Sequence, residues 1–170
     1  MSVLRILAIG GMSAAIYLGL GFEAVAGGRT LWPHVPAVVL ILAAWSFRTA
    51  PAVLIAAVVG LGCDAIGTGP MGPSVIAAVS AAFVGSVARE RWELESPLAA
   101  SLFGMGVAAV FLAAPAVVTA IAGEGPVPIG MAQVQVARAI ASALVATGLL
   151  LVARIASRVL KAMTAVLLDV

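Results

Sequence analysis

The chain alternates between long apolar intervals and short segments that hold most of its charged residues. Each of four predominantly apolar intervals has about the length that a membrane-spanning helix needs, roughly 20 residues. These intervals cover residues 6–22, 74–88, 97–122 and 131–153. The interval 74–88 is the shortest and reaches this length together with its flanking loop residues. The pattern therefore predicts four helices that cross a bilayer.

A fifth apolar stretch, residues 33–64, is interrupted once by a segment that contains Arg48 and Pro51. Pro51 fits the first position of a helix, where its missing N–H costs nothing. The break predicts two helices of about 15 residues, each about 22 Å long. Because a hydrocarbon core is about 30 Å thick, these helices either span with help from flanking residues or form a hairpin that enters and returns. The expected fold is all-α, a polytopic six-helix membrane bundle in which helices 2 and 3 are short.

The composition agrees with a chain surrounded by lipid. Hydrophobic residues make up 64% and charged residues 9% of the 170 residues, and the mean hydropathy is +1.23. Soluble domains contain about 25% charged residues, so these values argue against a soluble enzyme, a disordered chain or a coiled coil. A net charge of +2 is no footprint for nucleic acid. The single cysteine, Cys63, and the single histidine, His34, exclude an internal disulfide, a thiolate metal cluster and a multi-histidine metal site.

The basic residues predict how the helices are oriented in the membrane. With the N-terminus in the cytoplasm, seven basic residues lie on the cytoplasmic side and only Arg29 lies in an outer loop. The seven are Arg5, Arg48, Arg89, Arg91, Arg154, Arg158 and Lys161. This excess follows the positive-inside rule, so we expect a multi-pass protein with both termini in the cytoplasm. A cleaved signal peptide is the alternative for the first segment, but its apolar run of about 17 residues exceeds the usual signal core.

Small residues recur at four-residue spacing in three of the predicted helices. They are Gly11, Ala15 and Gly19; Ala52, Ala56 and Gly60; and Ala77, Ala81 and Gly85. Residues four apart share one helix face, and membrane helices associate by close packing of small side chains. The stripe that ends at Gly60 continues one turn further to Asp64, so we expect a helix contact there in particular. The alternative is that an alanine-rich composition produces such runs by chance.

Arg138 is the one charged residue well inside a predicted helix. It lies seven residues past Met131, about 10 Å below the outer edge of that helix. Charges inside a membrane are costly and usually face the bundle interior or a partner. Asp64, at the outer end of its own helix, is the expected counter-ion in an intramembrane ion pair. The alternative is that Arg138 extends to the outer interface.

The end of the chain is predicted to form a separate unit. Residues 1–153 hold the transmembrane bundle, and residues 154–170 form a basic cytoplasmic amphipathic tail. Its cations Arg154, Arg158 and Lys161 share one helix face. Such a face is attracted to an anionic leaflet, so we expect the tail to bind membrane lipids at the surface. Docking of a partner protein is the alternative.

The sequence favours no catalytic role. No serine, cysteine or threonine has a visible base, since the single histidine lies between prolines in a predicted interfacial loop. No pair of carboxylates falls within the predicted spans, as a proton relay or a cation site would require. We therefore expect no enzyme activity and no cofactor.

One segment of about 60 residues carries a distinctive series of positions: Pro33 before an apolar run that ends near Trp45, a basic break at Arg48, and then Ala56, Gly60, Asp64 and Gly72. With these features, residues 33–91 resemble the rod shape-determining protein MreD family. In that family, glycines eight and four residues before an aspartate are followed by another glycine eight residues after it. Gly60, Asp64 and Gly72 match this pattern, and Ala56 stands in for the first glycine. The remaining two-thirds of the chain agrees with the family in topology and length.

The resemblance implies a role in a complex rather than a reaction. Proteins of this family are non-catalytic, multi-pass components of the bacterial inner membrane that help to position peptidoglycan synthesis along the side wall. They pair with the single-span protein MreC and act beside the actin-like MreB, the glycosyltransferase RodA and a class B penicillin-binding protein. The family is also similar in fold to the substrate-binding component of energy-coupling factor vitamin transporters, which makes such a component the alternative function. Residues 6–22 lack the Ala-x-x-x-Ala pair of those components, and this counts against the alternative.

Overall fold

The computed structural model describes residues 33–66, 71–91, 96–121 and 129–168, together with positions 18, 19, 21 and 25. This part of the chain contains five helices and no strand, so the prediction of an all-α fold is confirmed for it. The helices are α2 (Val35–Ser46), α3 (Thr49–Ile66), α4 (Pro73–Arg91), α5 (Pro97–Ile121) and α6 (Ile129–Leu168). The first predicted helix, residues 6–22, lies almost entirely outside the described residues, as do Gly11 and Ala15 of its small-residue stripe. The third member of that stripe, Gly19, lies against the side chain of Val35.

The predicted break in the fifth apolar stretch is present. Only Phe47 and Arg48 separate α2 from α3. The two helices have 12 and 18 residues, instead of about 15 each. Pro51 is the third residue of α3 rather than the first. This position is compatible with proline because the first four N–H groups of a helix have no acceptor within it.

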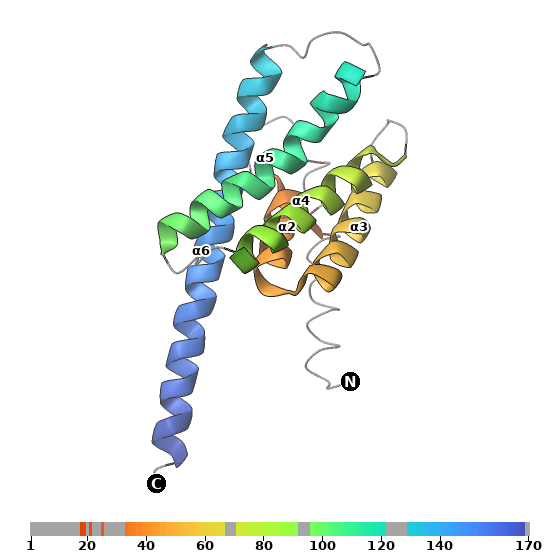
Figure 1. The fold of residues 1–170 in the computed structure, drawn as a ribbon. Helices are drawn as coiled ribbons and strands as arrows, with labels where there is room; N and C mark the ends of the chain where they lie inside the picture. Colours follow the sequence, from red (N-terminus) through yellow and green to blue (C-terminus); the bar gives the residue numbers. More distant parts are fainter. Residues whose placement is uncertain are drawn as a thin grey trace.

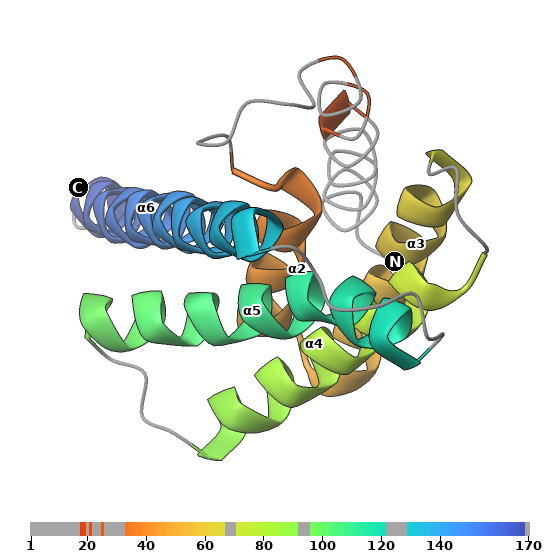
Figure 2. The ribbon, with the colours of Figure 1, turned by 90° about the horizontal axis from the view of Figure 1, so that it is seen from above.

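α2 is the central helix of the fold. It contacts α3, α4, α5 and α6, and Figure 1 and Figure 2 show these helices arranged around it. Eight of its 12 residues are buried. A helix that is apolar on every side suits this position, since none of its faces has to meet water. Enclosure by the other helices explains how a segment of only about 18 Å forms a stable helix here.

The helices define two ends of the bundle. Ser142 of α6 contacts His34 at the start of α2, and Arg154 of α6 contacts Trp45 near the end of α2. Arg89, near the end of α4, also contacts Trp45. α2, α4 and α6 therefore run in one direction, and α3 and α5 connect them in the other. We call the two ends the His34 end and the Trp45 end.

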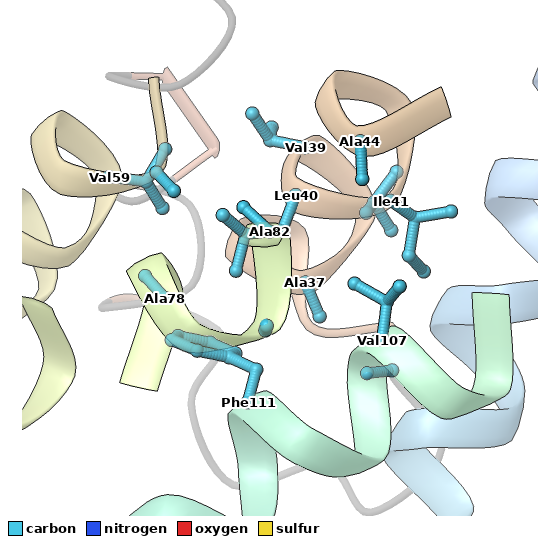
Figure 3. Close-up of a cluster of buried hydrophobic side chains, with 14 of the residues drawn as sticks. Ala37, Val39, Leu40, Ile41, Ala44, Val59, Ala78, Ala82, Val107 and Phe111 are labelled. Atoms are coloured by element: carbon cyan, nitrogen blue, oxygen red, sulfur yellow. The ribbon is translucent and has the colours of Figure 1, made fainter. Parts of the chain in front are cut away.

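The core consists mainly of small side chains. Figure 3 shows alanines of α2 and α4 that meet Val107 and Phe111 of α5, with Leu40 and Ile41 among them. The small-residue stripes of α3 and α4 are buried in the bundle: Ala52, Ala56 and Gly60, and Ala77, Ala81 and Gly85. Because these side chains are small, the helices approach each other closely.

Many large apolar side chains of α3, α4, α5 and α6, by contrast, point outward. On α3, Leu54, Val58 and Leu61 are 69%, 61% and 54% exposed and lie three or four residues apart. The outer faces of α4, α5 and α6 carry similar side chains, including Ile76, Phe83, Leu98, Leu102, Leu144 and Val152. Monomeric soluble proteins rarely expose contiguous apolar surface of this extent. Small residues inside and large apolar residues outside are typical of a protein surrounded by hydrocarbon.

α6 is the longest helix and continues past the predicted end of the transmembrane bundle. Its 40 residues extend over about 60 Å, twice the thickness of a hydrocarbon core. Its segment Ala132–Ala156, like α3, is long and apolar enough to cross a membrane. The helix has no break between residues 153 and 154, so the tail projects as a continuation of α6 (Figure 1). A tail lying flat on the membrane surface needs a bend at this point, and the helix contains none there.

Candidate functional site

The side chain of Asp64, in the last turn of α3, reaches the start of α4. Its Oδ2 accepts a hydrogen bond from the Gly72 N–H at 2.8 Å, and its Oδ1 accepts one from the Ser74 N–H at 3.1 Å. Pro73 lies between these two residues and has no N–H to donate. The carboxylate thus accepts from the first two N–H groups available at this helix start. Its negative charge also lies at the positive end of the α4 dipole.

Gly72 supplies the turn that this arrangement needs. Its φ is +122°, a backbone conformation that residues with a side chain rarely adopt. The turn directs the Gly72 N–H back to Asp64, while the Gly72 carbonyl oxygen accepts the N–H of Ile76 at 3.0 Å inside α4. Gly72 therefore joins the carboxylate to the first turn of α4.

Gly60 allows α3 and α4 to approach each other one turn before Asp64. A Cβ added at Gly60 would lie 2.5 Å from Val75 Cα, 2.7 Å from the Ser74 carbonyl oxygen and 2.8 Å from Val75 N. All three are backbone atoms of α4, which cannot turn aside as a flexible side chain can. The absence of a side chain at Gly60 is thus a condition for the short distance between the two helices.

The structure brings three of the four residues of the predicted motif to one place. We call it the Asp64 junction and define it as Gly60, Asp64, Gly72 and Ser74. The fourth motif residue, Ala56, lies one turn earlier on the same face of α3 and is fully buried. Asp64 itself is only 8% exposed. The junction holds the α3–α4 hairpin together through close backbone contact and two hydrogen bonds to a buried carboxylate.

The structure does not place Arg138 beside Asp64. α3 and α6 make no contact with each other. Both carboxylate oxygens of Asp64 face the start of α4, whereas Arg138 lies one turn from Ser142, where α6 meets the start of α2. The expected ion pair is therefore wrong in this structure. Its physical reason is local competition, because backbone N–H groups within ten residues of Asp64 take up its carboxylate.

His34 connects the start of α2 to α6. Its N–H donates to Ser142 Oγ at 2.8 Å, and the Ser142 hydroxyl donates to the Arg138 carbonyl oxygen at 2.7 Å. The imidazole ring meets Phe111 of α5 edge-on, with 5.5 Å between ring centroids. Sequence reasoning places His34 in an interfacial loop and misses this contact. Its partner Ser142 lies 108 residues away, and nothing in the local pattern points to it.

Replacing Ser142 with alanine is expected to destabilise the protein by about 1–3 kcal/mol, because the His34 N–H loses its acceptor. Unfolding of the purified protein in detergent measures the change. Thr147→Val is the matched control, since the Thr147 hydroxyl donates to the Ala143 carbonyl oxygen within α6 at 2.8 Å and its contact with another helix is a longer hydrogen bond, which it accepts from Ser101 of α5 at 3.4 Å. Its loss is expected to cost less than about 1 kcal/mol. Equal losses for the two variants would contradict the role of Ser142 in joining α2 to α6.

The three cations predicted to bind the membrane surface differ in their surroundings. The guanidinium of Arg154 lies over the Trp45 ring, 5.4 Å from its centroid. Arg158 is exposed one turn further along α6. Lys161 belongs to the helical backbone of α6, and its side chain lies outside the described residues. Arg154 is therefore the member of the group that takes part in a contact between helices.

The polar contacts at Asp64 and His34 both connect helices and involve side chains paired with backbone groups. In the described ranges, no three histidine, cysteine, aspartate or glutamate side chains are grouped so that they could hold a metal ion. Comparison of the chain with protein-family models, with the curated proteins and with the solved structures found no match.

Proposed function

We propose that this protein is a non-catalytic component of a bacterial inner membrane, which binds a MreC-type partner and helps to position peptidoglycan synthesis during cell elongation. The observation that carries the proposal is the Asp64 junction. Gly60, Asp64 and Gly72 are the residues that match the spacing of the MreD family, and all three serve one helix contact. Because these three residues share one structural role, they support the resemblance better than their spacing alone does.

The proposal includes a multi-pass topology with six helices and both termini in the cytoplasm. The rows of large apolar side chains on the outer faces of α3, α4, α5 and α6 support contact with lipid. Among the arginines that the structure describes, Arg138 belongs to the half of α6 near the His34 end. The others lie at or beyond the Trp45 end: Arg48, Arg89, Arg91, Arg154 and Arg158. By the positive-inside rule, this distribution supports a cytoplasmic Trp45 end.

Partner binding within a bilayer depends on the shape of a helix face. The small-residue stripe of α3, Ala52, Ala56 and Gly60, already packs inside the bundle, so it offers no surface to a partner. The outward face of α3 carries Leu54, Val58 and Leu61. α3 contacts only α2 and α4 among the described helices and so lies at the edge of this part of the bundle. Its outward face is therefore the first surface on which to seek the partner.

Site-specific crosslinking in the native membrane tests the proposal. Photoreactive residues at Leu54 and Val58 sample the outward face of α3, and one at Leu144 samples the outward face of α6 for comparison. We expect α3 to capture a MreC-type protein, identified by mass, and Leu144 to capture it less. Co-purification of the two proteins in detergent is the second readout.

Two results would count against the proposal. Equal capture of unrelated membrane proteins from both helices would mean that no defined partner surface exists there. Purification with a vitamin-sized molecule and without a MreC-type protein would favour the alternative, a substrate-binding component of an energy-coupling factor transporter.

A further inference from the structure

Trp45 contacts the guanidinium groups of two arginines that belong to two other helices. Arg89, near the end of α4, donates from Nη1 to the Trp45 carbonyl oxygen. Arg154 of α6 places its guanidinium 5.4 Å from the centroid of the Trp45 ring. The backbone and the ring of one residue therefore hold two cations that are far apart in the sequence.

Packing fixes Trp45 in its position. Its ring meets Phe103 of α5 edge-on, with 5.4 Å between centroids and 72° between ring planes. Gly85 lets α4 pass close to this region, since a Cβ there would lie 3.1 Å from Ala44 Cβ and 2.7 Å from Val107 Cγ2. The Trp45 carbonyl group belongs to the negative end of the α2 dipole, which favours a nearby cation. The two guanidinium groups are thus attached to a closely packed part of the bundle.

Among the side chains that the structure describes, more are basic than acidic at the Trp45 end. Arg48, Arg91 and Arg158 are exposed at or beyond it, in addition to the two arginines at Trp45. The carboxylate that the structure describes at this end is that of Glu90, whose Oε1 accepts a hydrogen bond from Thr49 at 3.2 Å. A local excess of cations on a low-dielectric surface attracts anions.

Apolar surface continues from these cations along the outside of the bundle. Ile155 follows Arg154 on α6 and is 62% exposed. Leu98 and Leu102 are exposed on the first turns of α5, at the same end. A ligand with an anionic head and hydrocarbon tails matches both surfaces, whereas a free anion would use the cations alone.

We propose that Trp45, Arg89 and Arg154 form a binding site for the phosphate headgroup of an anionic phospholipid from the cytoplasmic leaflet. Arginine binds phosphate through charge-assisted hydrogen bonds, and Arg89 keeps further N–H donors besides the one directed to Trp45. Tryptophan is favoured at the depth of the headgroups, and basic pockets between helices on the cytoplasmic side suit such lipids. The site depends on the proposed orientation of the Trp45 end and is independent of the identity of the protein partner.

Native mass spectrometry of the full chain in detergent, with added phosphatidylglycerol or phosphatidylcholine, tests this site. We expect the unmodified protein to bind phosphatidylglycerol about tenfold more tightly than phosphatidylcholine, as one or two charge-assisted hydrogen bonds imply. Arg154→Gln and Arg89→Gln are each expected to weaken phosphatidylglycerol binding about tenfold, whereas Arg89→Lys retains part of it. Arg154 is exposed, so its variant is expected to fold and decides the test where Arg89→Gln does not fold.

Arg91→Gln is the matched control, because it removes the same charge from an exposed residue two positions after Arg89. Because solvent and salt screen exposed charges, we expect this variant to change the affinity for phosphatidylglycerol by less than about twofold. A loss as large as that of Arg154→Gln would show general surface attraction and overturn the site, and so would equal binding of the two lipids. Binding of inorganic phosphate distinguishes a site for a lipid headgroup from a site for a free phosphate ion. If inorganic phosphate binds as tightly as phosphatidylglycerol, the assignment to a lipid is wrong. None of these outcomes bears on capture of a MreC-type protein, so the two proposals can fail separately.

Discussion

Replacing Gly60 with alanine is expected to destabilise the protein by about 3 kcal/mol, the upper end of the usual cost of overpacking a core. The added methyl group would meet Val75 Cα at 2.5 Å and the Ser74 carbonyl oxygen at 2.7 Å, and these backbone atoms can retreat only if α4 moves. Such a movement also lengthens the hydrogen bonds from Gly72 and Ser74 to Asp64. Thermal unfolding in detergent, followed by circular dichroism, measures the loss.

Two glycines that face open space provide the control for this variant. A Cβ added at Gly106 or Gly148 would meet nothing within 4 Å. Alanine at either position is expected to leave the free energy of unfolding unchanged or to raise it by up to about 1 kcal/mol, because alanine favours the helix more than glycine does. If Gly60→Ala proves as stable as these controls, close approach of α3 and α4 is not required for folding.

Asp64→Ala is expected to produce a loss of similar size, about 3–4 kcal/mol. The change removes the acceptor of two N–H groups, those of Gly72 and Ser74, and each unsatisfied buried donor costs about 1–3 kcal/mol. Asp64→Asn keeps one acceptor oxygen but turns an NH2 group toward the other donor, so we expect about half of this loss. Both values come from the same unfolding measurement.

Glu90→Gln is the control for the removal of a carboxylate. Glu90 is exposed and accepts one hydrogen bond from Thr49 at 3.2 Å, so its neutralisation is expected to cost less than about 1 kcal/mol. An Asp64→Ala protein as stable as Glu90→Gln would mean that the start of α4 needs no carboxylate from α3.

The positions of the helices follow from local signals in the sequence. The break between α2 and α3 coincides with Arg48 and the approaching Pro51, and α5 begins at Pro97 as the apolar interval predicts. The contact of Asp64 with the start of α4 could be predicted from the same local signals, because Gly72 lies only eight residues from Asp64. A carboxylate followed by a glycine and proline turn contains both the acceptor and the start of the next helix.

Which helices pack against each other could not be predicted from the sequence. In lipid, both the inside and the outside of a bundle are apolar, so hydrophobicity does not tell one helix face from the other. Charge complementarity suggested Asp64 and Arg138 as partners, but α3 and α6 do not meet. The contact of His34 with Ser142 depends on how α2 is enclosed by its neighbours, which no spacing along the chain encodes.

Helix propensity predicts the length of α6, whereas the charge pattern predicts a boundary within it. Arg154, Arg158 and Lys161 suggested a separate tail, although no glycine or proline follows Gly148. Alanine, leucine, arginine and lysine all favour a helix, so nothing in residues 149–168 stops one that has already formed. Helix propensity thus explains why α6 continues through residues 153 and 154, where the distribution of charges predicts the bundle to end.

The two contacts of α6 with α2 have a mechanical consequence. Ser142 meets His34 and Arg154 meets Trp45, at nearly equal separations along the two helices, about 17–18 Å. A shift of α6 by one residue, about 1.5 Å, would disturb both contacts at once. Force applied to the projecting end of α6 is therefore transmitted to both ends of α2 at once.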